Sequence, residues 1–270
     1  MKIYNLTNTI SSYNKNLEYT SDKSLAEIII VGGKKINLEE FPKLKGIFKT
    51  GVGTDNLPFK ESKENDILIE LPSNKTKEII YNETAIFTLH LILSLFYKSI
   101  GDFNRWEKSK RESTKNTDVL IIGLGNIGKK VLNLTSPIFN VETFDILSNS
   151  TDELDDKLKS SDFVTLHLPL NDETYHFMGK KRLSKLKNKS CLINTSRGQI
   201  VDEDALYSEL ESKRLFAALD VFSKEPYDGK LNSIKENLIK TPHIASSCID
   251  FYDGLANDFI KFYNKINESD

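Results

Sequence analysis

The chain has 270 residues, 39% of them hydrophobic and 10% aromatic, which is enough to form two domains with ordinary cores. Its formal net charge of −2 gives no electrostatic case for nucleic acid or an anionic membrane surface as a partner. We expect no leader and no apolar run near the ~20 residues that span a bilayer, hence a cytoplasmic protein. Cys191 and Cys248 lack metal-ligand spacing and are expected to be reduced thiols, with no metal bound.

Four short strands are predicted in the first quarter of the chain. They are residues 2–6, 27–31, 44–48 and 67–71. The segments between them are polar and leave little room for long helices. This pattern predicts a small α/β domain, separate from the rest of the chain.

Residues 85–100 are apolar nearly all round, which predicts a long buried helix with Asn82 as a possible N-cap. This helix is expected to link two domains. The polar stretch 101–117, which contains Trp106, is expected to cross between domains or to meet a second subunit.

A strand that breaks into a glycine turn is predicted at residues 118–128. The apolar run 119–122 is typical of a buried parallel strand, and Gly123, Gly125 and Gly128 then fall in G-x-G-x-x-G spacing. Such spacing allows a tight turn, close approach of a pyrophosphate and close packing of the next helix, whose N-terminus attracts phosphate. Glycine turns after strands also occur for packing reasons alone, so the motif needs its context.

The next strand, residues 141–145, supplies that context. Asp145 lies twenty residues past Gly125, where a carboxylate accepts hydrogen bonds from the adenosine ribose and repels a 2′-phosphate. No Arg or Lys lies within residues 146–149. The pattern therefore favours NAD over NADP.

Strands and helices then alternate along the chain. A capping box at 150–153, helices at 180–186 and after Asp202, and strands at 163–168, 191–195, 216–221 and 238–241 are predicted. This order indicates a doubly wound parallel sheet of the Rossmann type, with ligands at the carboxyl ends of its strands. The last segment, 251–266, has helical spacing and is expected to pack on the first domain.

Three of these strand ends carry reactive side chains. Arg197 can bind a carboxylate and polarise a carbonyl, although a surface salt bridge is an equal interpretation. His243 can exchange a proton near neutral pH, and a carboxylate such as Glu225 would orient its ring. Taken singly, Glu225 is a solvated charge and His243 a loop histidine. The hypothesis of a catalytic site therefore rests on all three meeting at one sheet edge.

Over residues 44–247 the chain resembles the D-isomer-specific 2-hydroxyacid dehydrogenases. The resemblance is carried by Gly-Leu-Gly-Asn-Ile-Gly at 123–128, His-Leu-Pro-Leu at 167–170, Asn-Thr-Ser-Arg-Gly at 194–198, Leu-Asp-Val-Phe at 219–222 and Thr-Pro-His at 241–243. It implies a discontinuous, flavodoxin-like substrate-binding domain at 1–81 and 252–270, and an NAD-binding Rossmann domain at 82–251. A homodimer through the nucleotide domain and the region around Trp106 is also implied.

The resemblance further implies roles for individual residues. Arg197, Glu225 and His243 would be the catalytic set. The expected NAD site comprises Gly123, Gly125, Asn126, Ile127, Gly128, Asp145, Leu168, Pro169, Thr195, Ser196, Asp220 and Ala245. The expected substrate site comprises Lys49, Gly51, Val52, Gly53 and Arg197. Lys49 stands where many relatives carry Arg, which leaves recognition of a phosphate or a second carboxylate open.

The expected activity is hydride transfer between nicotinamide and a small D-2-hydroxy acid or 2-oxo acid, of the glycerate, phosphoglycerate, glyoxylate or hydroxypyruvate type. The alternative is an NAD(H)-sensing binding protein, similar to corepressors of the same fold, without significant turnover. A Rossmann domain with a fortuitous site is a third interpretation, which the number of motifs disfavours.

Overall fold

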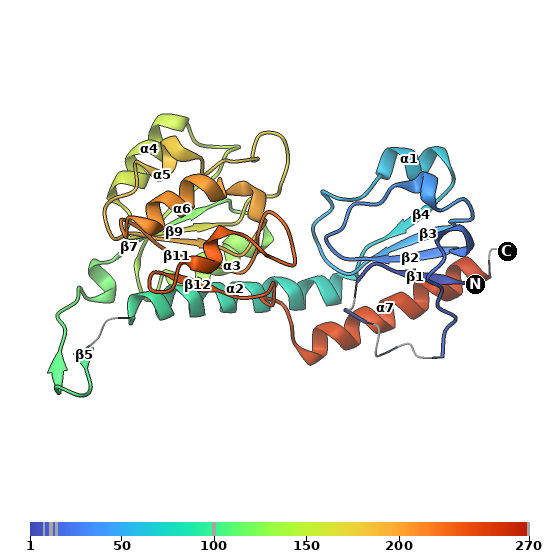
Figure 1. Ribbon diagram of the computed structural model, residues 1–270, viewed down its shortest axis with the longest axis horizontal. Coiled ribbons are helices and arrows are strands. Elements are labelled where there is room, and N and C mark those ends of the chain that lie inside the picture. The colour runs from blue at the N-terminus through green and yellow to red at the C-terminus, as the bar shows by residue number, and fades with distance from the viewer. Residues whose placement is uncertain (8, 11–12, 14–15, 99–100, 269–270) are drawn as a thin grey trace. The chain divides into compact units, whose positions relative to one another are not determined.

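The computed structural model describes residues 1–7, 9–10, 13, 16–98 and 101–268 (Figure 1). Two compact units are present: residues 1–80 together with 246–270, and residues 81–245. The predicted boundaries between the domains were 81/82 and 251/252. In the structure the first boundary lies one residue earlier, at 80/81, and the second lies six residues earlier, at 245/246. The predicted helix 85–100 ends on residues 99–100, which lie outside the described part.

The first unit contains a parallel sheet in the order β1-β2-β3-β4. Its strands are β1 (Ile3–Asn5), β2 (Ile28–Val31), β3 (Gly46–Lys49) and β4 (Leu68–Glu70). All four predicted strands are confirmed, shorter by one or two residues. Tyr19 forms a further parallel bridge to Ile3 on the outer edge of β1. The segment at Tyr19 lies between β1 and β2 in the chain, but on the outer side of β1 in the sheet. Counted along the chain, the order in the sheet is therefore second, first, third, fourth, fifth, which is the flavodoxin-like pattern.

The C-terminal helix α7 (Ile249–Asn267) covers one face of this sheet. Its Phe259 and Phe262 are fully buried against Phe48 of β3, with ring centroids 5.3 and 5.8 Å apart. The prediction that this segment packs on the first domain is confirmed. Gly46 allows this approach, because a Cβ there would lie 2.3 Å from Ile266.

Helix α2 (Asn74–Phe96) begins eleven residues before the predicted start, so Asn82 lies within the helix and is not its cap. The Ser73 hydroxyl accepts the Thr76 N–H, and Asp258 of α7 accepts bonds from Ser73 N–H and Thr76 hydroxyl. These tertiary contacts stabilise a polar first turn that periodicity alone does not identify.

The second unit is a doubly wound α/β domain, as predicted. Its six parallel strands have the order β12-β11-β10-β9-β7-β8. The strands are β7 (Asp118–Ile122), β8 (Asn140–Phe144), β9 (Phe163–Leu166), β10 (Cys191–Asn194), β11 (Phe216–Leu219) and β12 (Leu238–Lys240). The strand order reverses between β7 and β9, and ligands bind parallel sheets at such a switch point.

Helices cover both faces of this sheet. On one face α2 and α3 (Asn126–Thr135) pack on Val119, Ile121 and Ile193. On the other face lie α4 (Thr151–Ser160), α5 (Lys180–Leu183) and α6 (Glu203–Glu211), packed on Leu120, Ile122 and Leu192. Alternate residues of one strand thus serve the two cores, as a fully buried parallel strand requires. The capping box at Ser150 and the Asp202 N-cap are both present.

Three further features were not predicted. Helix α1 (Phe59–Glu64) precedes β4, and β5 (Gly101–Asp102) and β6 (Glu107–Lys108) form an antiparallel hairpin that projects from the second unit. Single turns of 3-10 helix lie at Lys23–Leu25, Leu38–Glu40, Thr114–Asn116, Gly198–Ile200 and Lys230–Ser233.

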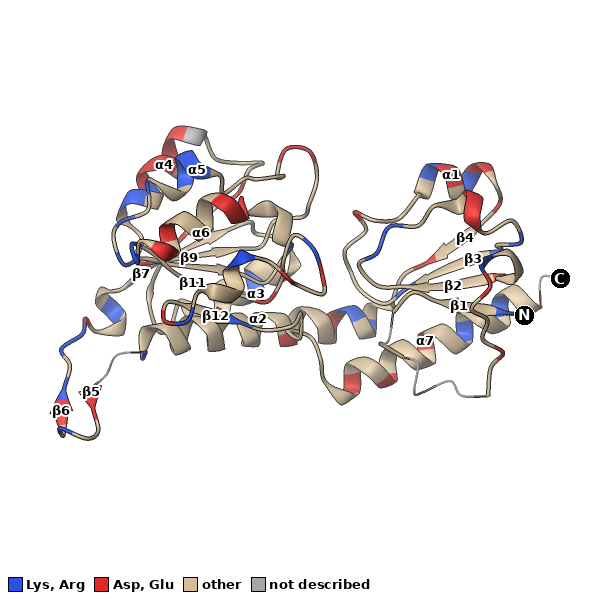
Figure 2. Ribbon diagram, viewed as in Figure 1, with Lys and Arg blue, Asp and Glu red and all other residues tan. Residues whose placement is uncertain are grey.

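By length and composition alone α2 could cross a membrane, which differs from the sequence expectation. Its apolar side chains Ala85, Leu91 and Ile92 instead pack on the sheet of the second unit. Core helices of globular proteins pass the same test. In the view of Figure 2, basic and acidic residues are interspersed along the ribbon of both units.

Replacing Phe259 with Ala should remove the centre of the first unit's core. We expect a loss of about 3–5 kcal/mol in the free energy of unfolding, because a buried phenyl ring leaves a cavity. Lys261→Ala, at an exposed position of the same helix, is the control and should change stability by less than about 0.5 kcal/mol. Urea denaturation followed by circular dichroism measures both. Equal stability of the two variants would contradict the assigned packing of α7.

Candidate active site

The glycine turn has the geometry that the sequence motif predicts. Gly123 has φ = 95°, and a Cβ there would lie 2.6 Å from the His167 carbonyl oxygen. A Cβ on Gly128 would lie 1.9 Å from the Gly123 carbonyl oxygen. Both positions therefore require glycine. Gly125 precedes the first turn of α3, and open space lies where its Cβ would be.

Asp145 comes directly after β8 and is tied to the glycine turn. One carboxylate oxygen accepts the Leu124 N–H at 2.8 Å, and the other accepts the Leu147 N–H at 3.0 Å. Each oxygen has a second lone pair, so the carboxylate retains capacity for two hydroxyl donors. The residue predicted to bind the ribose thus also fixes the turn beside it.

The ends of β9 and β10 form the next part of this sheet edge. Leu168 is buried, whereas Pro169 is exposed. The backbone and Cβ of His167 border the glycine turn, and desolvation of its imidazole lowers the pKa of this ring to about 3, which keeps it neutral. Its Nε2 lies 3.0 Å from the Thr165 hydroxyl.

Asn194, at the end of β10, holds the segment that carries Arg197. Its side-chain oxygen accepts bonds from the Ser196 N–H and hydroxyl, and its amide nitrogen donates to the Arg197 carbonyl at 2.8 Å. Thr195 is buried, and its hydroxyl lies 2.9 Å from that of Thr88 on α2. Asn194 belongs to the Asn-Thr-Ser-Arg-Gly motif, but neither Asn194 nor Thr88 was predicted as a site residue. A polar residue that ends a buried strand was the available signal for Asn194.

The loops that carry Arg197 and Glu225 are packed together by their backbones. A Cβ on Gly198 would lie 1.9 Å from the Phe222 carbonyl carbon. Ser223 receives a bond from the Gln199 side chain at its carbonyl oxygen and donates its N–H to Glu203 at 2.7 Å. This close contact explains a strict need for glycine after Arg197.

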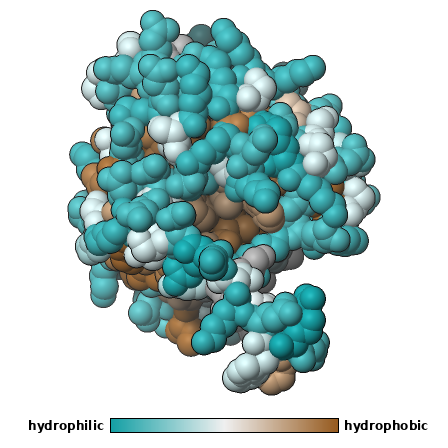
Figure 3. Space-filling view, turned by 90° about the vertical axis from the view of Figure 1, so that its left-hand side faces the viewer, coloured by the Kyte–Doolittle hydropathy of each residue, from teal (hydrophilic) through white to brown (hydrophobic). Residues whose placement is uncertain are grey.

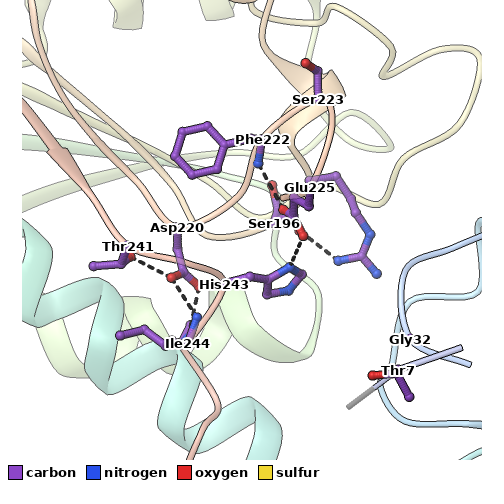
Figure 4. Close-up of polar contacts among 12 residues, drawn as sticks. Thr7, Gly32, Ser196, Asp220, Phe222, Ser223, Glu225, Thr241, His243 and Ile244 are labelled. Atoms are coloured by element: carbon purple, nitrogen blue, oxygen red, sulfur yellow. Dashed lines mark hydrogen bonds and ion pairs between the residues drawn. The ribbon is translucent and has the colours of Figure 1, made fainter. Parts of the chain in front are cut away.

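His243 and Glu225 are joined by a hydrogen bond, as the sequence order of their loops predicts (Figure 4). His243 Nδ1 lies 2.8 Å from Glu225 Oε2, and the other Glu225 oxygen accepts the Phe222 N–H at 3.0 Å. Both side chains remain partly exposed. Nε2 is then the ring nitrogen on the side away from Glu225.

The loop that carries His243 is held by Asp220, which is fully buried (Figure 4). Its carboxylate accepts the Thr241 hydroxyl at 2.6 Å and the N–H groups of Ile244 and Ala245 at 2.8 and 3.0 Å. The Asp220 carbonyl accepts the His243 N–H at 2.9 Å. His243 has φ = 55°, a conformation uncommon for residues other than glycine, and these bonds stabilise it.

Burial, hydrogen bonds and neighbouring charges shift the pKa values of the two acids at this edge. Partial burial raises the pKa of Glu225, but the hydrogen bond and charge of His243, the Phe222 N–H and the charge of Arg197 outweigh it, so its pKa lies below the ordinary value. Burial raises the pKa of Asp220 in spite of the bonds that it accepts. Arg197 is close enough for its charge to act on Glu225, and it donates to the Ser196 carbonyl at 2.8 Å.

The predicted substrate loop lies in the first unit, at the carboxyl end of β3. Lys49 is buried there and Gly51, Val52 and Gly53 are half-buried. The Lys49 ammonium donates to the Gly32 carbonyl and to the Asn56 side chain. A Cβ on Gly51 would meet open space.

The second unit therefore brings most of the predicted residues to one edge of its sheet. Arg197, Glu225 and His243 come after β10, β11 and β12. Gly123, Gly125, Asn126, Ile127 and Gly128 come after β7, and Asp145 comes after β8. Ala245 is held by Asp220. Within the described residues no group of three His, Cys, Asp or Glu side chains could hold a metal ion.

A dinucleotide fits the residues present at this edge. Gly125 leaves space for a pyrophosphate at the N-terminus of α3, whose N–H groups and dipole favour an anion. Asp145 lies one strand to the side, at the end of β8, and Thr195 lies two strands to the other side, at the end of β10. Neighbouring strands are about 4.8 Å apart, so an extended dinucleotide can run along these ends.

Comparison with known proteins identifies the family. Residues 96–245 match the family of D-isomer specific 2-hydroxyacid dehydrogenase, NAD binding domain. The hydroxypyruvate reductase of Thermotoga maritima is 31% identical over 228 residues, which cover 78% of this chain and 73% of the relative. The glyoxylate reductase of Thermococcus litoralis is 31% identical over 244 residues, covering 81% and 72%.

Solved structures agree on the fold. The D-lactate dehydrogenase of Aquifex aeolicus, complexed with NAD and lactic acid, superposes with a TM-score of 0.82 at 24% identity, covering 100% of this chain and 96% of that one. The family match covers more than half of the chain, and the relatives align along most of their length. The chain therefore belongs to the D-isomer-specific 2-hydroxyacid dehydrogenase family, and residues 96–245 match its NAD-binding domain.

Proposed function

We propose that this protein interconverts a small 2-oxo acid and its D-2-hydroxy acid with NAD(H), and that Arg197, Glu225 and His243 carry the reaction. The observation that carries this proposal is the 2.8 Å contact between His243 Nδ1 and Glu225 Oε2, at the same sheet edge as Arg197 and the glycine turn. Relatives named glyoxylate reductase, hydroxypyruvate reductase and D-3-phosphoglycerate dehydrogenase support the substrate class.

Asp145 supports NAD as the cofactor. Its carboxylate would repel the 2′-phosphate of NADP and accept hydrogen bonds from the ribose hydroxyls. Bound NADH supplies a hydride, and NAD⁺ accepts one in the reverse direction. The proposed cofactor contacts along this edge are those of the glycine turn, Leu168, Pro169, Thr195, Ser196, Asp220 and Ala245.

His243 is proposed as the acid and base. In reduction its Nε2 donates a proton to the carbonyl oxygen of the 2-oxo acid, and in oxidation the same nitrogen accepts the hydroxyl proton. The Glu225 carboxylate accepts from Nδ1 and so fixes the ring and stabilises its charged form. Arg197 binds the carboxylate of the acid and polarises the adjacent carbonyl. In the first unit, Gly51, Val52 and Gly53 are proposed to bind a substrate carboxylate through backbone N–H groups.

A homodimer is proposed on the basis of the projecting hairpin. Phe103 and Trp106 at its tip are 84% and 79% exposed, and their rings contact each other edge to face. Apolar patches lie among hydrophilic residues on the side from which the hairpin projects (Figure 3). A second copy that buries these rings would remove them from water. We further propose a cytoplasmic protein that binds neither nucleic acid nor membrane. The formal net charge of −2 gives no electrostatic support for either of these two partners.

His243→Ala should remove the proton donor and lower the turnover number by about 10²–10⁴-fold. The dissociation constant for NADH should stay within about twofold, because the glycine turn is untouched. NADH oxidation is followed with glyoxylate, hydroxypyruvate, pyruvate and 3-phosphohydroxypyruvate. His90→Ala, at an exposed position of α2, is the control. Full activity in His243→Ala would refute the assignment, and tight NADH binding without turnover of any substrate would favour a cofactor sensor.

Glu225→Gln should narrow the pH range of reduction from the alkaline side. Without the carboxylate the imidazolium is less stable, so the pH at which the reduction rate falls should move down by about one unit. Because the pKa of Glu225 lies below its ordinary value, the carboxylate is already ionised at mildly acidic pH, so the difference between the proteins should be confined to the alkaline limb. The pH dependence of kcat/KM measures this, and an unchanged alkaline limb would contradict the proposed role.

Replacing Phe103 and Trp106 together with Ser should weaken the proposed dimer. Light scattering at micromolar concentration should show a dimer for the native protein and a monomer for the double variant, because two large apolar rings are lost from the contact. Phe59→Ser, at a 49% exposed position of the first unit, is the matched control. A monomeric native protein would rule the dimer out.

A further inference from the structure

Lys49 is a buried cation at the carboxyl end of β3. Only 3% of the residue is exposed. Lysine is almost never fully buried unless its ammonium is bonded, since desolvation of the charge is costly. Such a residue therefore has a specific structural task.

The Lys49 ammonium and Asn56 form one network with the turn after β2. Lys49 Nζ lies 2.5 Å from the Gly32 carbonyl oxygen and 2.6 Å from Asn56 Oδ1. Asn56 Nδ2 donates to the same Gly32 carbonyl at 2.9 Å and to the Lys34 carbonyl at 2.6 Å. Every side-chain polar atom of Asn56 is thus engaged.

This network brackets the segment 51–53. Lys49 anchors its start and Asn56 its end, both onto the turn at Gly32. Thr50 adds two bonds to the Val31 carbonyl, from its N–H at 2.9 Å and its hydroxyl at 3.2 Å. Gly51 has no side chain to pack, and a Cβ there would meet open space. The shape of the segment therefore depends on the anchors beside it.

We propose that Lys49 is a positioning residue that, together with Asn56, holds the Gly51–Gly53 backbone in the shape that binds the substrate carboxylate. The proposal rests on the proposed function, in which these N–H groups are the ligands. Lys49 then acts through the loop, and its ammonium is not the cation that contacts the substrate. A loop fixed in advance loses less conformational entropy on binding, so its anchors favour substrate affinity.

The proposal is tested with Lys49→Met, which keeps the length of the side chain and removes the ammonium, and with Asn56→Ala. The KM for glyoxylate should rise about tenfold in each, with kcat within about twofold, because binding is weakened and chemistry is not. The double variant should show no larger rise than either single variant, since both break one network. Lys49→Arg, which retains a cationic donor, should show a smaller rise than Lys49→Met.

Lys45→Met is the matched control. Lys45 immediately precedes β3, at the opposite end of that strand from Lys49, and is partly exposed in an ion pair with Glu27. Its loss should leave the KM unchanged. An unchanged KM in Lys49→Met, an equal rise in Lys45→Met, or a fall in kcat at constant KM would overturn the proposal.

Hydrogen exchange of residues 50–56 without substrate separates this proposal from the proposed function. Amides of this segment should exchange at least about tenfold faster in Lys49→Met and Asn56→Ala than in the native protein or Lys45→Met, because local opening becomes easier. Unchanged exchange would overturn the positioning role even if the native protein reduces glyoxylate. Faster exchange in a protein that turns over no 2-oxo acid would refute the proposed function and leave the anchoring role intact.

Discussion

A buried carboxylate holds the part of the second unit on which its proposed chemistry depends. Asp220 directly follows β11 inside the protein, and it accepts hydrogen bonds from the hydroxyl and N–H groups of the segment 241–245. Burying an acid is unfavourable unless its oxygens are bonded. Three donors from one loop meet this requirement, and in doing so they fix His243 in a backbone conformation with positive φ. The position of the imidazole is therefore set from within the core.

Rigid backbone contacts then place the partners of His243. Gly198 lies against the backbone of Phe222, so the loop after β10 is in direct contact with the loop after β11. Asn194 fixes the Arg197 carbonyl from one side, and the Phe222 N–H fixes Glu225 from the other. Polar groups at strand ends thus hold the segments that carry Arg197, Glu225 and His243.

The two units use buried charge in related ways. In the second unit Asp220 collects N–H donors, and in the first unit the Lys49 ammonium collects a carbonyl and an amide oxygen. In both cases one charged group joins loops from neighbouring parallel strands at the carboxyl edge of a sheet. Side chains exposed at these edges are then left for a ligand, while the buried charges maintain the loops.

The sequence by itself determined the class of fold, the succession of strands along the second unit and the identity of most candidate residues. Apolar runs bounded by Gly, Pro and polar residues mark buried strands, and parallel strands place their carboxyl ends at one edge. Gly123, Asp145, Arg197, Glu225 and His243 could therefore be grouped from their positions along the chain. Cap residues such as Ser150 and Asp202 act within a few residues and were predicted correctly.

Tertiary structure alone decided the remaining features. The start of α2 depends on Asp258, 182 residues from Thr76, and the hairpin at 101–108 has no periodicity to reveal it. Whether Lys49 contacts a ligand or supports a loop depends on where its four-carbon chain ends, and that is set by Gly32 and Asn56 on other segments. Local sequence determines which residues can form strands, turns and caps, whereas contacts between distant segments determine which buried polar groups find partners.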